Sequence, residues 1–210
     1  MESKLTKSVY VVGPTFGIEP IFHRYGYKTY NDATIRSNEE KVDIVCFMGG
    51  VDINPKLYGE PIHEWTQRPS NERDAKEIAT YHKFKHLPKL GICRGAQLLC
   101  VLNGGSLYQH VDRHGGSNHH VTDIHGRRTV VCSVHHQMMR PGKDSVLVAW
   151  AENVSTERFT AHERHESDGV DPEVVFIPKD KALLFQGHPE FGPESCTNYF
   201  FDLVKEYIHG

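Results

Sequence analysis

The sequence predicts an α/β fold with a mostly parallel central sheet, helices on both faces and added antiparallel strands. In the first half of the chain, short apolar runs alternate with helical patterns, and this order predicts parallel strands joined by crossover helices. In the second half, apolar runs follow one another more closely, which predicts the antiparallel strands. The 210 residues contain no internal repeat and no linker-like stretch, so we expect a single domain over residues 1–210.

Seven apolar runs, rich in β-branched residues and bounded by turn residues, are predicted to be strands. They cover residues 9–12, 44–48, 90–92, 129–134, 146–150, 174–177 and 183–186. Apolar residues at helical spacing predict helices over 72–85, 95–102 and 194–208. The segments 49–70 and 112–127, rich in glycine and polar residues, are predicted to be long surface loops, which commonly carry function.

Composition narrows the function classes. The net charge of −3 argues against a strongly basic nucleic-acid binder, and no apolar run approaches the roughly 20 residues that span a bilayer. The polar start of the chain lacks the pattern of a secretory signal. Five cysteines, an odd number spread along the chain, fit reduced thiols better than disulfides. We therefore expect a cytoplasmic protein that binds neither nucleic acid nor membrane.

The most informative stretch is Gly91-Ile92-Cys93-Arg94-Gly95, where a predicted strand runs into a predicted helix. In this setting Gly-x-Cys-x-Gly is typical of a nucleophile elbow, with cysteine in place of serine. The two glycines leave room for a sharp, strained turn. Unpaired backbone N–H groups at a helix N-terminus favour a thiolate and can face a developing oxyanion. Cys93 is therefore the predicted nucleophile.

A cysteine nucleophile needs a base, and the base needs a group that orients it. The stretch Gln186-Gly187-His188-Pro189-Glu190 follows a predicted strand and precedes the last helix. His188 and Glu190 are therefore expected at the edge where open α/β sheets bind ligands. Because side chains at positions i and i+2 of an extended segment point the same way, we expect His188 to be the base and Glu190 its orienting partner.

Together these motifs resemble the class I glutamine amidotransferase superfamily. Further stretches narrow the resemblance to its γ-glutamyl-γ-aminobutyrate hydrolase branch and extend it over most of the chain. These stretches are Met48-Gly49-Gly50-Val51-Asp52-Ile53-Asn54-Pro55, Tyr58-Gly59-Glu60, Arg73-Asp74 with Glu77, Cys93-Arg94-Gly95-Ala96-Gln97-Leu98-Leu99, Gly104-Gly105-Ser106-Leu107-Tyr108-Gln109 and Ser133-Val134-His135-His136-Gln137.

The resemblance implies a flavodoxin-like fold and hydrolysis of a γ-glutamyl amide through a thioester, without a metal or cofactor. It implies that Cys93 attacks the γ-carbonyl carbon and that the backbone N–H groups of Gly50 and Arg94 form the oxyanion hole. His188 would protonate the departing amine and then activate water, with Glu190 orienting it. One oxyanion-hole donor is typically worth about 3 kcal/mol of barrier.

By the same resemblance, Gln97 and the backbone at Ser133, Val134 and His135 would hold the amino and carboxylate groups of the glutamyl part. The chain departs from the branch at Cys100, where asparagine is usual, and in shorter loops on the leaving-group side. The identity of the amine is therefore not predicted, and neither is the oligomeric state.

Two activities stay open. The first is a stand-alone hydrolase that cleaves a γ-glutamyl amide of a small amine and releases glutamate. The second is a glutaminase subunit that hydrolyses glutamine and supplies ammonia to a separate synthetase partner. A non-catalytic binding protein is disfavoured because all three members of the triad are present. The chain has no phosphate-binding glycine loop, so we do not expect it to bind ATP.

Other polar residues receive plainer interpretations. The five histidines at positions 110, 114, 119, 120 and 125 are predicted to lie in a solvated loop, because their spacing fits no standard zinc pattern. The histidines at 135 and 136 lack an obvious acidic partner. The acidic residues at 74 and 77 fit helix capping as well as binding. The cysteines at 46, 100 and 132 are predicted to be inert core residues.

Overall fold

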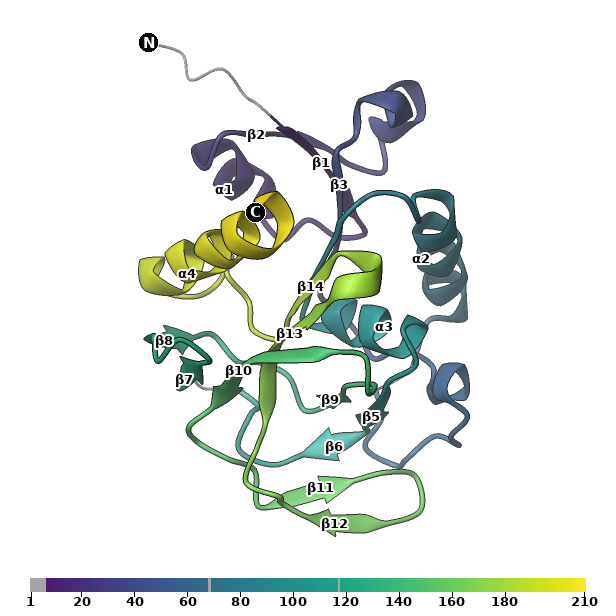
Figure 1. Cartoon of the computed structure of the whole chain (residues 1–210). Coiled ribbons are helices and arrows are strands. Elements are labelled where there is room, and N and C mark those ends of the chain that lie inside the picture. The colour runs from purple at the N-terminus through teal and green to yellow at the C-terminus, as the bar shows by residue number, and fades with distance from the viewer. Residues whose placement is uncertain (1–6, 68, 117) are drawn as a thin grey trace.

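The computed structural model describes residues 7–67, 69–116 and 118–210, which build a large central sheet covered by helices (Figure 1). Five neighbouring strands of this sheet run parallel. In sheet order they are β2 (Tyr27–Tyr30), β1 (Lys7–Val12), β3 (Ile44–Phe47), β4 (Lys89–Ile92) and β14 (Ala182–Phe185). Numbered along the chain within this half, the order is 2-1-3-4-5, which is the flavodoxin-like order.

The sheet continues beyond β14 through four antiparallel strands. They are β13 (Pro172–Ile177), β10 (Val146–Ala151), β7 (His119–Asp123) and β8 (Arg128–Val131). Two small antiparallel sheets lie beside the large one. Their strands are β12 (Arg164–Glu166), β11 (Glu157–Phe159) and β6 (His110–Val111) in one sheet, and β5 (Ser106–Tyr108) and β9 (Met138–Arg140) in the other.

Helices cover both faces of the parallel half (Figure 1). On one face, α1 (Ile18–Arg24) and α4 (Glu194–Val204) enclose a core in which Phe22 contacts Phe200 and Phe201 edge to face. On the other face, α2 (Asn71–Lys83) and α3 (Arg94–Leu102) pack over a second core. The remaining helical turns are η1 (Ile35–Ser37), η2 (Glu39–Lys41), η3 (Pro55–Tyr58), η4 (Pro178–Asp180) and the π-helical η5 (Lys205–His209).

The α/β, flavodoxin-like fold predicted from the sequence is confirmed. All seven predicted strands and all three predicted helices are present, with ends shifted by a few residues. The strand expected over 129–134 ends at Val131, and α2 begins one residue earlier than expected because the Ser70 side chain caps it, accepting from Arg73 N–H at 3.3 Å. Within the described ranges, no helix is long and apolar enough to cross a membrane.

Candidate active site

Three neighbouring strands of the parallel half deliver the predicted site residues to one edge of the sheet. The Gly49–Gly50 turn follows β3, Cys93 follows β4, and His188 follows β14. Because β3, β4 and β14 are adjacent and parallel, their carboxyl ends lie side by side. This is the edge at which open α/β sheets bind ligands.

Cys93 occupies a strained turn between β4 and α3. Its backbone has φ 51° and ψ −110°, a conformation that residues with a side chain rarely adopt. The flanking glycines permit this turn: a Cβ on Gly91 would lie 2.7 Å from Ala96 Cα, and a Cβ on Gly95 would lie 2.0 Å from the Phe47 carbonyl oxygen. The elbow predicted from the motif is thus present, with Cys93 at the N-terminus of α3.

His188 lies beside Cys93 and is oriented by Glu190. Its Nδ1 lies 2.8 Å from Glu190 Oε1, and the Glu190 side chain is fully buried. Burial alone would lower the pKa of His188, but hydrogen bonds to Cys93 and Glu190 outweigh it and raise the pKa to about 10. The imidazole therefore carries a proton at neutral pH. Gly49 lies close to both His188 and Cys93, since a Cβ at this position would lie 2.7 Å from His188 Cε1 and 3.6 Å from Cys93 Cβ.

The two amides predicted to form the oxyanion hole are available as donors. Across residues 7–67, 69–116 and 118–210, neither Gly50 N–H nor Arg94 N–H has an acceptor within hydrogen-bond distance. Gly50 has a φ of 143°, and a Cβ there would lie 2.0 Å from Arg73 Nη1. Glycine is therefore required at this position.

Side chains of helix α2 hold the residues that carry or adjoin these two amides. Arg73 Nη2 donates to the Met48 carbonyl at 3.0 Å and to the Gly49 carbonyl at 2.7 Å. The buried guanidinium of Arg94 donates to Asp74 at 2.5 Å and also to Glu77. The sequence left open whether these acidic residues cap the helix or bind. The structure shows that the carboxylates of Asp74 and Glu77 bind the side chain of Arg94, the residue after the nucleophile. Two acidic residues three positions apart lie on one face of a helix, and this spacing was the sequence signal that indicated a shared partner.

A small cavity of about 50 Å³ lies in front of Cys93. Three of the four predicted substrate-binding residues line it: Gln97, Val134 and His135. Ser133 is fully buried instead, and its hydroxyl donates to the His114 carbonyl at 2.5 Å. The full lining is Gly50, Asp52, Gln67, Cys93, Gln97, Val134, His135, His136 and Gln137.

Asp52 has a role that was not predicted from the sequence. The prediction that the histidines after Val134 lack acidic partners was wrong. His136 Nε2 lies 3.1 Å from Asp52 Oδ2, and His135 Nε2 lies 3.4 Å from Glu173 Oε1. Asp52 also accepts from Gln67 N–H at 2.7 Å, which shapes the wall of the cavity. Its place two residues after Gly50 was the sequence signal that could have predicted this role.

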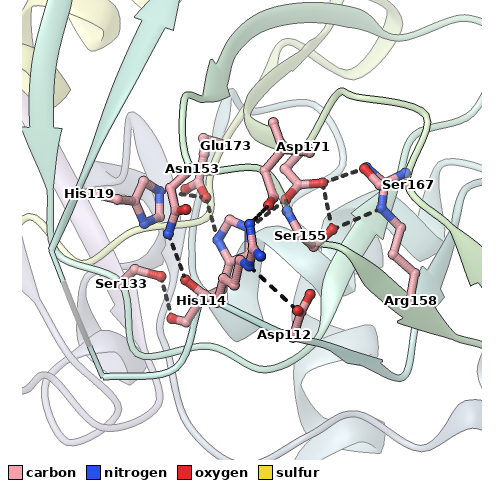
Figure 2. Close-up of polar contacts among 12 residues, drawn as sticks. Asp112, His114, His119, Ser133, Asn153, Ser155, Arg158, Ser167, Asp171 and Glu173 are labelled. Carbon is pink, nitrogen blue, oxygen red and sulfur yellow. Dashed lines mark hydrogen bonds and ion pairs between the residues drawn. The ribbon is translucent and has the colours of Figure 1, made fainter.

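The prediction of a solvated histidine loop was wrong for His114 and His119. Both are buried, and both lie within ion-pair distance of Glu173 (Figure 2). His120 and His125 are exposed, as predicted. The core interpretation of three cysteines is confirmed, since all are buried and burial raises each thiol pKa. These are Cys46, Cys100 and Cys132.

Comparisons with curated proteins give short matches. One relative is a Mycobacterium tuberculosis protein that is named as a glutamine amidotransferase. It is 45% identical over 38% of this chain and 27% of that protein. Another is the carbamoyl phosphate synthase small chain of Xanthomonas campestris, 31% identical over 52% of this chain and 26% of that protein. The chain thus covers well under two thirds of each relative.

Solved structures share the fold over nearly the whole chain. A glutamine amidotransferase from Thermotoga maritima superimposes with a TM-score of 0.62 at 16% identity, covering 97% of this chain and 84% of that one. PurLQS from the same organism gives a TM-score of 0.63 at 14% identity, covering 95% of this chain and 98% of that one. A family model described as Peptidase C26 matches residues 27–171, well over half of the sequence. The chain therefore belongs to the Peptidase C26 family.

Proposed function

We propose that this protein hydrolyses a γ-glutamyl amide through a thioester on Cys93, releasing glutamate and a small amine. The observation that carries the proposal is the meeting of Cys93, His188 and Glu190 at one sheet edge, where Glu190 Oε1 lies 2.8 Å from His188 Nδ1. A thiolate paired with an imidazolium is the reactive form of a cysteine nucleophile. The Peptidase C26 match supports amide hydrolysis as the reaction class.

In the acylation step, Cys93 Sγ attacks the γ-carbonyl carbon and forms a carbon–sulfur bond. The carbonyl oxygen becomes an oxyanion that the N–H groups of Gly50 and Arg94 stabilise. His188 Nε2 then gives its proton to the leaving nitrogen, the carbon–nitrogen bond breaks, and the thioester remains. Glu190 holds the ring through Nδ1, so that Nε2 faces the reacting atoms.

In the deacylation step, the same groups act in reverse order. Neutral His188 accepts a proton from a water molecule, and the resulting hydroxide attacks the thioester carbon. The oxyanion that forms accepts hydrogen bonds from the same two amides. The carbon–sulfur bond then breaks, Cys93 becomes a thiolate again, and glutamate leaves. Gln97, Val134 and His135 line the cavity and are proposed to hold the amino and carboxylate groups of the glutamyl part.

A second candidate is a glutaminase subunit that supplies ammonia to a separate synthetase. Exposed apolar residues at the site favour it: Val51 follows Gly50, Val134 lines the cavity and Phe191 follows Glu190, and they are 42%, 51% and 53% exposed. Exposed apolar residues gathered at one place are typical of a surface that a partner covers. Similarity to the carbamoyl phosphate synthase small chain supports the same alternative.

The experiment that tests the proposal measures glutamate release from glutamine and from a panel of γ-glutamyl amines, by the chain alone and with candidate synthetases. High turnover of a γ-glutamyl amine without a partner supports the stand-alone hydrolase. Activity on glutamine alone, appearing when a synthetase is added, supports the subunit instead. No glutamate release from any substrate, with or without partners, contradicts both. The Cys93→Ala variant serves as the blank.

A further inference from the structure

Buried histidines surround the carboxylate of Glu173, and Figure 2 shows two of them, His114 and His119, beside it. We call this group the histidine cluster: His114, His119, His135 and Glu173. His114 comes from the loop after β6, His119 begins β7, His135 follows β8, and Glu173 lies on β13. Each of the four is at most 5% exposed. Four separate segments thus bring ionisable side chains to one buried point.

Three ring nitrogens lie around the same oxygen atom. Glu173 Oε1 is 3.0 Å from His119 Nε2, 3.3 Å from His114 Nδ1 and 3.4 Å from His135 Nε2. In a tetrahedral zinc site, metal–ligand distances of about 2.0–2.1 Å place the ligand atoms roughly 3.3–3.4 Å from one another. The ligand atoms of His114, His119 and Glu173 also lie within 4.8 Å of one another. The spacing therefore suits a shared small cation.

Two of the rings have one nitrogen engaged and the other aimed at Glu173. His135 Nδ1 lies 2.8 Å from the Gln137 carbonyl oxygen, so Nδ1 carries the hydrogen and donates. His114 Nε2 donates to Asp171 Oδ2 at 2.6 Å. Among the described residues, His135 Nε2 and His114 Nδ1 have no hydrogen-bond partner. On the neutral ring of His135, Nε2 is then a lone pair facing a carboxylate oxygen, and a cation between them removes the repulsion.

Among the described residues, no lysine or arginine lies within ion-pair distance of Glu173, whereas Asp171 has an arginine partner. Arg158 Nη2 pairs with Asp171 Oδ1 at 2.5 Å. In the part of the chain that the structure describes, the groups within ion-pair distance of Glu173 are all histidines. A buried carboxylate needs a positive partner or a full set of hydrogen bonds, and Glu173 Oε2 has no partner in the same residues.

We propose that the histidine cluster binds one divalent transition-metal ion of the zinc type. The first three ligands are His114, His119 and Glu173, whose ligand atoms lie within 4.8 Å of one another. His135 Nε2, which lies 3.4 Å from Glu173 Oε1, is proposed as the fourth. Such ions prefer a nitrogen-rich set of this kind. Asp171 accepts from the other nitrogen of His114, which is the arrangement that orients metal-bound histidines in many proteins. Four protein ligands in a buried position make this a structural site and not a catalytic one.

The position of His135 gives the ion an effect on the reaction centre. His135 is a proposed ligand on one side and a lining residue of the Cys93 cavity on the other. Ser133, two positions earlier, donates to the carbonyl of His114, a second proposed ligand. The ion therefore fixes the segment 133–137, of which residues 134–137 form one wall of the cavity. Removal of the ion is expected to loosen this wall.

The test is a titration of chelator-treated, tag-free protein with Zn²⁺ and with Co²⁺. A Cys93→Ala background removes the nucleophile as a competing ligand. We expect one Zn²⁺ per chain by calorimetry and elemental analysis, and a visible Co²⁺ spectrum typical of tetrahedral coordination without the thiolate charge-transfer band. In His119→Gln and Glu173→Gln, affinity should fall by at least about 100-fold. The matched control is His120→Gln, on the next and exposed residue of β7, whose affinity should stay unchanged.

The alternative to this proposal is that no metal binds and that a protonated His114 donates a hydrogen bond to Glu173. The outcomes of the titration distinguish the two. Absence of a stoichiometric Zn²⁺ or Co²⁺ site in the Cys93→Ala chain overturns the proposal. Equal loss of binding in His120→Gln also overturns it, since that side chain lies outside the cluster. If His119→Gln fails to fold, the Co²⁺ spectrum of the chain with its cluster intact still decides, because a spectrum without tetrahedral bands contradicts the assigned ligands.

Discussion

The Arg73 guanidinium and the Gly49 carbonyl are joined by a 2.7 Å hydrogen bond from Nη2 to the oxygen. That carbonyl belongs to the same planar peptide group as the N–H of Gly50, and in a trans peptide the two groups point in opposite directions. The described residues contain no cis peptide bond. Arg73 therefore fixes the direction of the Gly50 N–H, which is one of the two amides proposed to stabilise the oxyanion.

Replacing Arg73 by methionine should lower kcat by about 10- to 100-fold and leave KM nearly unchanged. The expected loss is somewhat below that for removing an oxyanion-hole donor outright, roughly 100- to 1,000-fold, because the amide remains and only its orientation loosens. Steady-state kinetics on the preferred γ-glutamyl substrate measure both constants. An effect confined to KM would contradict the assigned positioning role.

The matched control for this change is Lys76→Met on the same helix. Lys76 is exposed and pairs with Asp32, and it has no hydrogen bond to the Gly49–Gly50 turn among the described residues. Loss of an exposed ion pair costs little stability, typically less than about 1 kcal/mol. Its kcat should therefore match that of the unmodified protein, and an equal fall in both variants would point to a general disturbance of α2.

Cys93→Ala should abolish glutamate release while the fold persists. The side chain is small and the strained φ of 51° is set by the surrounding turn, so alanine introduces no new contact. Circular dichroism should show an unchanged spectrum, and a glutamine-like electrophile such as diazo-oxonorleucine should label the unmodified chain at Cys93 alone. Turnover by the alanine variant, or a label mapped to another cysteine, would refute the nucleophile.

Glu190→Gln should shift the alkaline limb of the kcat/KM profile to lower pH. Burial lowers the pKa of His188, whereas hydrogen bonds to Cys93 and Glu190 raise it to about 10, so a neutral glutamine removes one of the raising partners. The reduction in rate should be about 10- to 100-fold and milder than for His188→Ala. An alkaline limb at the same pH in both proteins would show that Glu190 does not support the imidazolium.

The same shift makes a prediction about stability. Because the folded-state pKa of His188 lies above the ordinary histidine value of 6.5, the stability that its protonated ring contributes is fully present below about pH 6.5 and is lost as pH rises toward about 10. The melting temperature of the unmodified protein should therefore fall more over this pH range than the melting temperature of Cys93→Ala, which lacks one of the two groups that raise the pKa of His188. Parallel melting curves for the two proteins would contradict this coupling.

Local sequence patterns predicted most of the parallel half and the elbow, because those elements are defined by their own residues. Apolar runs predicted β1, β3, β4 and β14. The pattern failed for β2, whose four residues include the polar Lys28 and Thr29. It also failed for α1, a helix of seven residues whose buried members are Ile18 and Phe22. Such short elements depend on packing against the rest of the sheet, which a local pattern does not contain.

The histidine cluster and the buried Arg94 show a different limit. His114 lies in a stretch rich in glycine and polar residues, so its neighbours in the sequence predict exposure. Its burial depends on Asp171 and Glu173, which come from the far end of the chain and supply the partners that a buried imidazole needs. Arg94 likewise is buried because α2 delivers two carboxylates to it. Polar burial is a property of the tertiary structure.

The elbow glycine after the nucleophile gives the most direct test of how tightly this edge of the sheet is packed. In Gly95→Ala, the new Cβ would lie 2.0 Å from the Phe47 carbonyl oxygen and 2.9 Å from the Phe47 Cβ. Backbone atoms of β3 cannot move aside cheaply, so the free energy of unfolding should fall by about 3 kcal/mol. Gly115→Ala is the control, because a Cβ there meets none of the described residues within 4 Å, and its unfolding free energy should change by less than about 1 kcal/mol. Denaturant unfolding followed by circular dichroism measures both, and equal stability of the two variants would mean that α3 does not pack against β3 at this distance.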